Sequence, residues 1–295
     1  MSTPLPFHRF SHEAMTTNFD ALIVHDDAKY ARQAANAAFA EIERCERLLN
    51  RHDPGTEVAM INRLKPGEWL RVSSDVLTCL EIAARAFIET QGAFDVCFRS
   101  TEKGKRPSAM NFLLLSRPDS AEPDQPSDFL VGIDPEAAIH GFESADIDLG
   151  GIGKGYALDV AMPLLIDYSI ENVLLNSGTS TVLALGDGPQ GDGWTVGVSG
   201  DYHDMTRFSS THLRNCALSG SGTAVKGEHI RNPESGGAAG AIASWVKTTS
   251  AAWTDALSTA MMVMKPEMAR DYLQGKPDVS ALVIYDDHFH SHGQW

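Results

Sequence analysis

The most informative part of the sequence is the run Asp148-Leu149-Gly150-Gly151-Ile152-Gly153-Lys154-Gly155-Tyr156-Ala157-Leu158-Asp159. An acidic residue ends an apolar segment there, and a glycine-dense turn with one lysine leads into a helix-like pattern. Glycines allow a ligand to approach backbone N–H groups closely, and a helix start carries a partial positive charge. The run lacks the spacing of a dinucleotide fingerprint and the Gly-Lys-Ser/Thr ending of a P-loop. Taken alone, it indicates either a contact with a ligand phosphate or a tight structural turn.

The overall charge limits the classes of partner. The 295-residue chain is 43% hydrophobic, enough for a sizeable core, and carries 39 acidic against 24 basic residues, a formal charge of −15. The basic residues form no run, so nucleic acid is excluded as a partner. Because the protein's field repels anions, a phosphate ligand needs backbone dipoles, a lysine or a divalent cation. The charge therefore favours a metal-assisted phosphate site in a soluble globular protein.

The chain shows no targeting or membrane signal. Residues 1–10 contain no basic head followed by an apolar run, and no later segment has the uncharged length of a membrane span. We therefore expect no membrane span and a cytoplasmic location. The cysteines occur singly, without Cys-x-x-Cys spacing, which is typical of reduced thiols at packed positions. They are Cys45, Cys79, Cys97 and Cys216.

Capping residues and helical spacing predict the elements of the first half. A long helix capped by Asp26 or Asp27 should stop near residue 53, and a second helix from residue 73 or 74 should end at Gly92. Residues 101–128 are rich in Pro, Ser, Asp and Lys. We expect them to form mostly a long loop.

The second half alternates more clearly. We expect strands near 173–175, 194–198, 241–246 and 280–285. A helix should follow the glycine turn as far as residue 168, with a bend or restart at Pro163, and two more helices should begin after Ser250 and at Pro266. There is no regular βαβ repeat. The pattern therefore predicts an α+β fold, a single domain over residues 1–295 with mixed sheets flanked by helices.

Four segments resemble, in order and spacing, the signature blocks of the ApbE family, the FAD:protein FMN transferases. They are Gly92-Ala93-Phe94-Asp95, the run from Asp148 to Ala157, His229-Ile230-Arg231-Asn232-Pro233-Glu234-Ser235-Gly236, and Asp255-Ala256-Leu257-Ser258-Thr259-Ala260. Weaker similarities are Met15-Thr16-Thr17, Thr56-Glu57 followed by Ile61-Asn62, and Asn176-Ser177-Gly178-Thr179. The resemblance spans almost the whole chain.

The resemblance implies an enzyme that binds FAD and a divalent cation, usually Mg²⁺. Members of the family transfer the FMN half of FAD onto a threonine or serine hydroxyl of an acceptor flavoprotein and release AMP. Two alternatives stay open: an FAD pyrophosphatase that yields FMN and AMP, and a divergent FAD-binding protein without catalysis. The sequence does not identify the acceptor, and it leaves open whether the chain forms a homodimer.

The resemblance places the metal on the carboxylate of Asp255, the hydroxyl of Thr259 and the backbone carbonyl of Gly153. Residues four apart project from the same face of a helix, and carboxylate, hydroxyl and carbonyl oxygens are the hard ligands that magnesium prefers. Without the resemblance, an Asp and a Thr at this spacing would more often be a capping or solvent-facing pair.

The implied reaction is the attack of a hydroxyl on a phosphorus of the diphosphate. A metal ion and Lys154 would stabilise the charge that develops as AMP leaves. The acceptor hydroxyl needs a proton acceptor near neutral pH, and His229 of the family's His-Ile block is the candidate base. Taken alone, a histidine beside a Pro-Glu-Ser-Gly turn would be an ordinary loop residue.

The resemblance also implies a set of FAD contacts. They are Met15, Glu57, Gly151, Lys154, Asp159, Asn176, Gly178 and Thr179. The alternative for most of them is core packing and turn formation. Two segments depart from the family pattern: Cys97-Phe98-Arg99-Ser100 replaces the usual Gly-Pro-Leu continuation, and the stretch from Ser219 to His229 is shorter than usual. Both lie where an acceptor protein or the isoalloxazine ring is expected.

Overall fold

The computed structural model describes residues 6–99, 107–117, 129–198, 210–222, 237, 239–286 and 288–295. Its strands are β1 (Phe7–Ala14), β2 (Thr17–Val24), β3 (Trp69–Val72), β4 (Leu113–Ser116), β5 (Phe129–Ile133), β6 (Val173–Ser177), β7 (Thr181–Leu185), β8 (Trp194–Gly197), β9 (Ser210–Leu213), β10 (Cys216–Gly222), β11 (Ala243–Thr248), β12 (Ser280–Ile284) and β13 (Phe289–His292). Its helices are α1 (Ala28–Leu49), α2 (Glu57–Ile61), α3 (Ser74–Glu89), α4 (Gly153–Asp167), α6 (Ala251–Val263) and α7 (Pro266–Gln274), with 3-10 turns η1 (Ala109–Phe112) and η2 (Pro135–Ala138).

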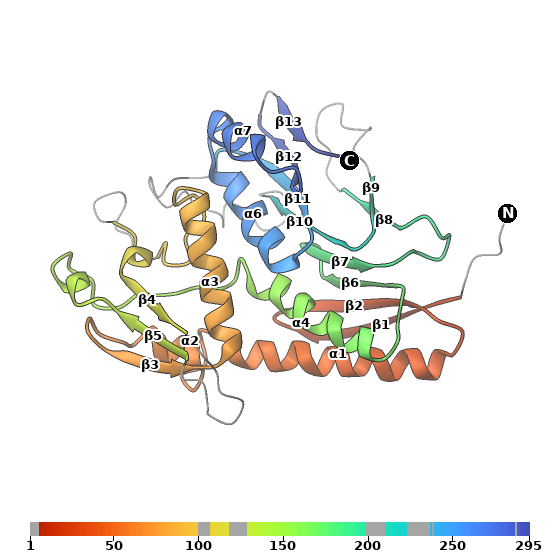
Figure 1. Cartoon of the computed structure of the whole chain (residues 1–295), viewed down its shortest axis with the longest axis horizontal. Helices are drawn as coiled ribbons and strands as arrows, with labels where there is room; N and C mark the ends of the chain where they lie inside the picture. Colours follow the sequence, from red (N-terminus) through yellow and green to blue (C-terminus); the bar gives the residue numbers. More distant parts are fainter. Residues whose placement is uncertain are drawn as a thin grey trace.

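Eight strands form one large sheet in the order β1-β2-β6-β7-β10-β11-β12-β13 (Figure 1). Every strand pair within the described ranges is antiparallel. In strand β2, Phe19, Ala21 and Ile23 lie on one face of the sheet and are fully buried. The α+β class expected from the sequence is confirmed.

Helices α1, α4 and α6 pack against one face of this sheet (Figure 1). The capping predictions are confirmed for two of them: Asp27 accepts hydrogen bonds from the first turn of α1, and Ser250 accepts one from the amide of Trp253 in α6. Helix α1 ends at Leu49, earlier than residue 53. Helix α4 runs through Pro163 without a restart. All residues of α6 except Thr259 are buried, so this helix forms the centre of the core.

A second sheet, in the order β3-β5-β4, lies beside α3 (Figure 1). It corrects the expectation of a long loop over 101–128, because η1 and β4 fall within that range. Leu115 of β4 pairs with Val131 of β5, so this short apolar strand depends on a distant partner that local composition does not reveal. Residues 101–106 and 118–128 of the range lie outside the described residues. One apolar cluster includes side chains from both sheets, which supports a single domain.

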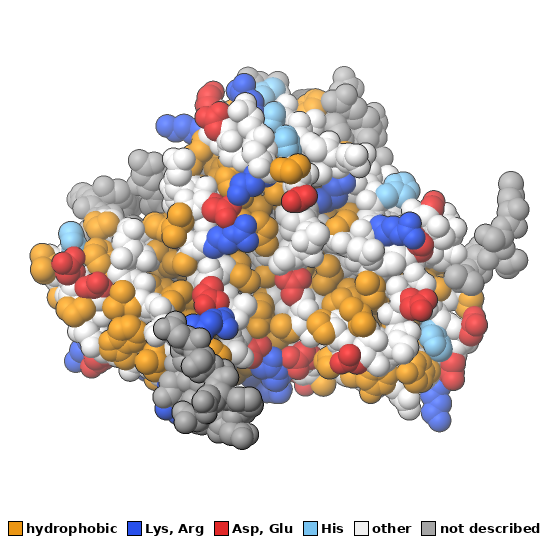
Figure 2. Space-filling view, in the orientation of Figure 1, with side chains coloured by type: hydrophobic (Ala, Val, Ile, Leu, Met, Phe, Trp, Pro, Cys, Tyr) orange, Lys and Arg blue, Asp and Glu red, His pale blue; other side chains and the backbone are white. Residues whose placement is uncertain are grey.

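The opposite face of the large sheet has a smaller apolar cluster under the β8–β9 hairpin and Trp295. The four cysteines are free thiols, as expected, and Cys45, Cys79 and Cys97 are buried. Figure 2 shows acidic and basic side chains interspersed over the visible face, without a continuous basic stripe. Within the described residues, no helix has the length and apolar character needed to cross a membrane.

Candidate functional site

The segment before the glycine turn belongs to neither sheet and is held by side chains. The Asn62 amide donates to the carbonyl oxygen of Ile147 at 2.9 Å and accepts from the Ile147 amide, as a neighbouring strand would. Arg51 donates to the same carbonyl at 3.1 Å. The amide of Asp148 donates to the carbonyl oxygen of Val96 at 2.8 Å. These contacts fix the position from which the glycine turn starts.

The glycine turn leads directly into α4, whose first residue is Gly153. The carbonyl oxygen of Leu149 accepts from the amides of Ile152 and Gly153, and the Asp148 carboxylate accepts from Gly150 at 3.0 Å. Ile152, at the N-cap position of α4, makes no side-chain capping bond. The start of a helix favours an anionic ligand, and the Asp255 carboxylate accepts there from the amide of Gly155 at 3.4 Å.

Helices α4 and α6 touch at Gly155. A Cβ atom at this position would lie 2.3 Å from the carbonyl oxygen of Ala251, so only glycine fits there. The close contact brings Asp255 of α6 to the start of α4: Gly155 N lies 3.4 Å from Asp255 Oδ2, and Lys154 Nζ lies 3.8 Å from the same oxygen. The lysine also donates to the carbonyl oxygen of Gly150 at 3.1 Å.

Asp255 is only 4% exposed and is surrounded by donors. Its Oδ1 atom accepts from the hydroxyls of Thr181 at 3.3 Å and Ser219 at 3.2 Å. These two residues are opposite each other on β7 and β10, so sheet register brings both hydroxyls to the carboxylate. Neither residue was predicted as part of the site, because no local spacing connects strand hydroxyls to a helix that follows much later in the chain.

Thr259 lies one turn beyond Asp255 and beside the glycine turn. Its hydroxyl donates to the backbone carbonyl of Asp255 at 3.2 Å, and a Cβ atom at Gly151 would lie 3.7 Å from that hydroxyl and 3.1 Å from the ring of Phe94. The structure thus brings together Gly151, Lys154, Asp255 and Thr259. Gly153, at the first position of α4, packs near Leu49.

A magnesium site here would rest on one carboxylate. The described residues contain no group of three or more His, Cys, Asp or Glu side chains that could hold a metal. The donor set around the turn, namely the Asp255 carboxylate, the Thr259 hydroxyl and backbone carbonyls, consists of hard oxygens and fits a magnesium ion that keeps several waters. The Lys154 ammonium supplies the counter-charge in this structure.

Asp159, expected among the FAD contacts, holds the N-terminus of α6. Its carboxylate accepts from the amides of Ala251 and Ala252 and from the Ser250 hydroxyl at 2.8–2.9 Å. Burial raises the pKa of Asp159, and these hydrogen bonds oppose the shift. The structure therefore gives this carboxylate a capping role.

Met15 and Glu57 also have identifiable contacts. Met15 has a φ of 49° in the two-residue turn between β1 and β2, a conformation typical of such hairpins, and its amide donates to Glu46 at 2.7 Å. Glu57 accepts from the amide and hydroxyl of Ser73, both at 2.8 Å, and so fixes the start of α3. The role of both residues as FAD contacts stays a prediction.

The segment from Asn176 to Thr179 forms the connection between β6 and β7. Asn176 alternates with Leu175 and Ser177, so its side chain lies on the face of the sheet opposite to α6 and Asp255. Gly178 has a φ of 65°, and a Cβ atom there would lie 2.2 Å from the Thr17 hydroxyl. This glycine is needed for the turn itself, and Thr179 is exposed. His229, the predicted base, lies outside the described residues.

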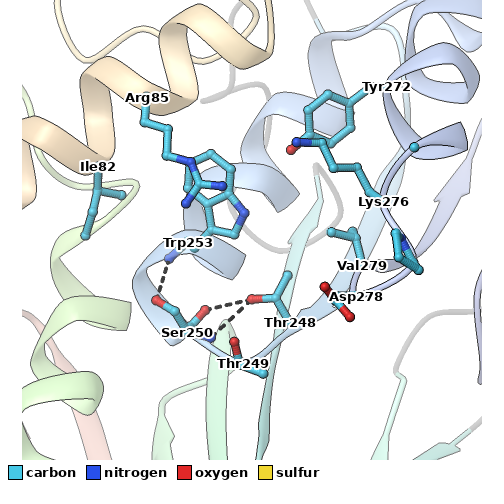
Figure 3. Close-up of a pocket in the computed structure, with 12 residues that line it drawn as sticks. Ile82, Arg85, Thr248, Thr249, Ser250, Trp253, Tyr272, Lys276, Asp278 and Val279 are labelled. Atoms are coloured by element: carbon cyan, nitrogen blue, oxygen red, sulfur yellow. Dashed lines mark hydrogen bonds between the residues drawn. The ribbon is translucent and has the colours of Figure 1, made fainter.

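A cavity of about 410 Å³ lies at the N-terminal end of α6, between α3 and α7 (Figure 3). Arg85 stacks over Trp253 at 4.1 Å from the ring centroid. Glu89 accepts from Arg85 at 2.7 Å, from Lys276 at 2.8 Å and from the Tyr272 hydroxyl at 3.3 Å. None of the predicted site residues lines this cavity. The bonds that Glu89 accepts from Tyr272 and Lys276 join α3 to α7 and to the segment that follows it.

The chain is similar in sequence and in fold to known proteins. The model of the ApbE family matches residues 15–283. The FAD:protein FMN transferase of Klebsiella pneumoniae (strain 342) is 25% identical over 230 residues, which are 73% of this chain and 68% of that protein. The ApbE protein from Thermotoga maritima superimposes with a TM-score of 0.75 at 22% identity over 97% of both chains. The flavin transferase ApbE from Vibrio cholerae has a TM-score of 0.73 at 20% identity, over 98% of this chain and 97% of that one.

Proposed function

Because the chain belongs to the ApbE family, we propose that it is an FAD:protein FMN transferase, which moves the FMN half of FAD onto a threonine or serine hydroxyl of an acceptor flavoprotein and releases AMP. The observation that carries this proposal is the meeting of the glycine turn with a buried carboxylate. Lys154 and the amide of Gly155, in the first turn of α4, both lie close to Asp255, and a helix start that carries a lysine is suited to bind a diphosphate.

The proposed ligands of Mg²⁺ are the Asp255 carboxylate, the Thr259 hydroxyl and the backbone carbonyl of Gly153. When bound, the ion would supply positive charge to the diphosphate oxygens. The chain itself orients the Asp255 carboxylate through the hydroxyls of Thr181 and Ser219. Lys154 is the protein's own cation for the phosphate that departs with AMP.

The proposed base is His229, which would accept the proton of the acceptor hydroxyl. Gly151 and Lys154 are the proposed FAD contacts that the geometry supports best, since both belong to the turn that faces Asp255 and Thr259. The other proposed contacts, Met15, Glu57, Asp159, Asn176, Gly178 and Thr179, follow from the resemblance alone. A cytoplasmic location and the choice between monomer and homodimer also stay predictions.

The test separates transfer from hydrolysis and from simple binding. Purified protein is incubated with FAD and Mg²⁺, with and without a candidate acceptor, while AMP and protein-bound flavin are measured. Transfer predicts AMP and bound flavin in equal amounts, both dependent on the acceptor. AMP with free FMN in the absence of acceptor would indicate a pyrophosphatase. FAD binding without AMP would indicate a non-catalytic flavin-binding protein.

A further inference from the structure

Arg99 lies beside the entrance to the glycine turn. Its Nε atom donates to Asp148 Oδ2 at 3.1 Å, while Asp148 Oδ1 accepts from the amide of Gly150. The guanidinium also lies 5.2 Å from the ring centroid of Phe98. The Asp148 carboxylate therefore lies between Arg99 and the turn that is proposed to receive the diphosphate.

The backbone fixes this position. The segment that ends in Arg99 runs beside the segment that enters the turn, because the Phe94 ring lies against Gly151 and the Val96 carbonyl accepts from the Asp148 amide at 2.8 Å. Arg99 follows Val96 by three residues. The backbone thus places the arginine beside Asp148 and the start of the glycine turn.

The charges around the turn distinguish Arg99 from the other cations described there. Lys154 is engaged with Asp255 and with the carbonyl oxygen of Gly150. Arg51 is 20% exposed and is shared among Ile147, Asp146 and Asp148. Arg99 is 52% exposed, and exposed ion pairs contribute little to stability. Its guanidinium can therefore exchange Asp148 for another anion at small cost.

We propose that Arg99 is a substrate-binding residue whose guanidinium leaves Asp148 and pairs with a phosphate of the FAD diphosphate. Arginine and phosphate form strong charge-assisted hydrogen bonds in a two-pronged geometry. In a chain with a net charge of −15, this contact would offset the repulsion that the anionic substrate meets at Asp148. The inference rests on the proposed function, because it names a further contact of the same substrate.

The experiment measures the Kd of FAD and of riboflavin, which has no phosphate, by calorimetry for four variants. Arg99→Ala should raise the Kd of FAD by about fivefold to tenfold at low salt, with a smaller effect at high salt and no change for riboflavin. Arg99→Lys should give an intermediate value. The matched control is Arg214→Ala, because Arg214 forms a similar exposed ion pair with Asp187 at 2.7 Å on the β9–β10 connection. It should bind FAD like the wild type.

The fourth variant, Asp148→Asn, distinguishes substrate binding from a purely structural role. If Arg99 binds phosphate, removing the charge of Asp148 releases the guanidinium and leaves FAD affinity unchanged or higher. If Arg99 only anchors the turn through Asp148, Arg99→Ala and Asp148→Asn weaken FAD binding equally, and that result would overturn the proposal. An unchanged Kd of FAD in Arg99→Ala would also overturn it. A wild-type protein that binds no FAD would instead overturn the proposed function. Arg99 is then tested with inorganic pyrophosphate, for which equal affinity of wild type and Arg99→Ala rejects the proposal.

Discussion

The ammonium of Lys154 lies 3.8 Å from Oδ2 of Asp255, so the lysine of the glycine turn and the carboxylate proposed for the metal form an ion pair. The two side chains come from different helices and are largely buried, at 19% and 5% exposure. In this arrangement the carboxylate has its counter-charge within the protein. Metal binding at Asp255 would compete with the pair and leave Lys154 available for a phosphate.

Asp255→Asn should weaken magnesium binding by roughly tenfold or more, because it removes the charged ligand. Thr259→Val should have a smaller effect, since water can replace a neutral hydroxyl that already donates to the backbone of Asp255 at 3.2 Å. Calorimetric titration of both variants with Mg²⁺ in the presence of FAD gives the comparison. If Thr259→Val is the more damaging, the metal does not depend on the Asp255 carboxylate as proposed.

His229→Ala should leave the Kd of FAD nearly unchanged but slow flavin transfer, because a general base typically contributes about a hundredfold or more to the rate. Binding and turnover are measured on one preparation. His212→Ala is the control, since His212 on β9 is bonded to Thr195 at 3.3 Å and should not affect the rate. Normal turnover in His229→Ala would show that another group accepts the proton.

Gly155→Ala should destabilise the protein by about 3 kcal/mol, because its Cβ atom would lie 2.3 Å from the carbonyl oxygen of Ala251 and must push α4 away from α6. Gly153→Ala is the matched control on the same helix. The Cβ atom of an alanine at this position would contact only Leu49, at 3.5 Å. Because alanine has a higher helix propensity than glycine, this variant should not lose stability. Urea unfolding of both variants measures the difference. Similar stabilities would mean that the two helices separate easily.

Asp95→Asn should stabilise the protein at neutral pH by on the order of 1 kcal/mol. Asp95 is 7% exposed, and its Oδ1 accepts from the amide of Cys97 at 2.7 Å. Hydrogen bonding with the Ser108 hydroxyl and with this amide offsets only part of the effect of burial on its pKa. Burial raises the pKa of Asp95, so the folded protein holds this proton more tightly than the unfolded chain.

The sign of the pH dependence follows from that shift. Wild-type stability should fall as the pH rises from about 4, the ordinary pKa of an aspartate, through the raised pKa of Asp95. Asp95→Asn should lack this component. Urea unfolding of both proteins between acidic and neutral pH tests the difference, and parallel pH profiles would show that the carboxylate finds compensation on folding.

Glu89→Ala should cost about 1–2 kcal/mol at neutral pH, because Arg85, Lys276 and Tyr272 all donate to this carboxylate. Glu81→Ala on the same helix is the control: its pair with Arg117 is exposed at 40% and 48% and should contribute less than about 0.5 kcal/mol. Burial alone would raise the pKa of Glu89, but the bonds from Lys276 and Arg85 lower it overall. The stabilisation should therefore disappear as the pH falls below about 4. Equal losses of stability in both variants at neutral pH would show that the three donors to Glu89 contribute no more than an exposed ion pair.

Sequence patterns predicted the elements that local signals define. The starts of α1 and α6 follow from Asp27 and Ser250, and α7 begins at Pro266 as expected. Strand β4 was missed because a run such as Leu113–Ser116 becomes a strand only when β5 pairs with it. The β1 segment, whose polar residues do not alternate with apolar ones, likewise becomes a strand by pairing with β2.

The site was predicted less completely, for a related reason. Asp255 and Thr259 share a helix face, and this spacing is visible in the sequence. The capping of α6 by Asp159 joins positions 91–93 residues apart, and no local pattern records such a contact. Thr181, Ser219 and Asn62 were missed in the same way, since strand register and chain crossing bring them to Asp255 and Ile147.

Strand β2 pairs with β6, although residues 25–172 lie between them. On the ribosome the β1–β2 hairpin can form early, but its open edge has no partner until residue 177 has been made. At about 5–20 residues per second, this takes roughly 8–30 s. During that time Phe19, Ala21 and Ile23, which are fully buried at the end, belong to an unpaired edge strand of the kind that invites aggregation. Until β6 has been made, the hairpin therefore exposes an edge that the finished sheet covers.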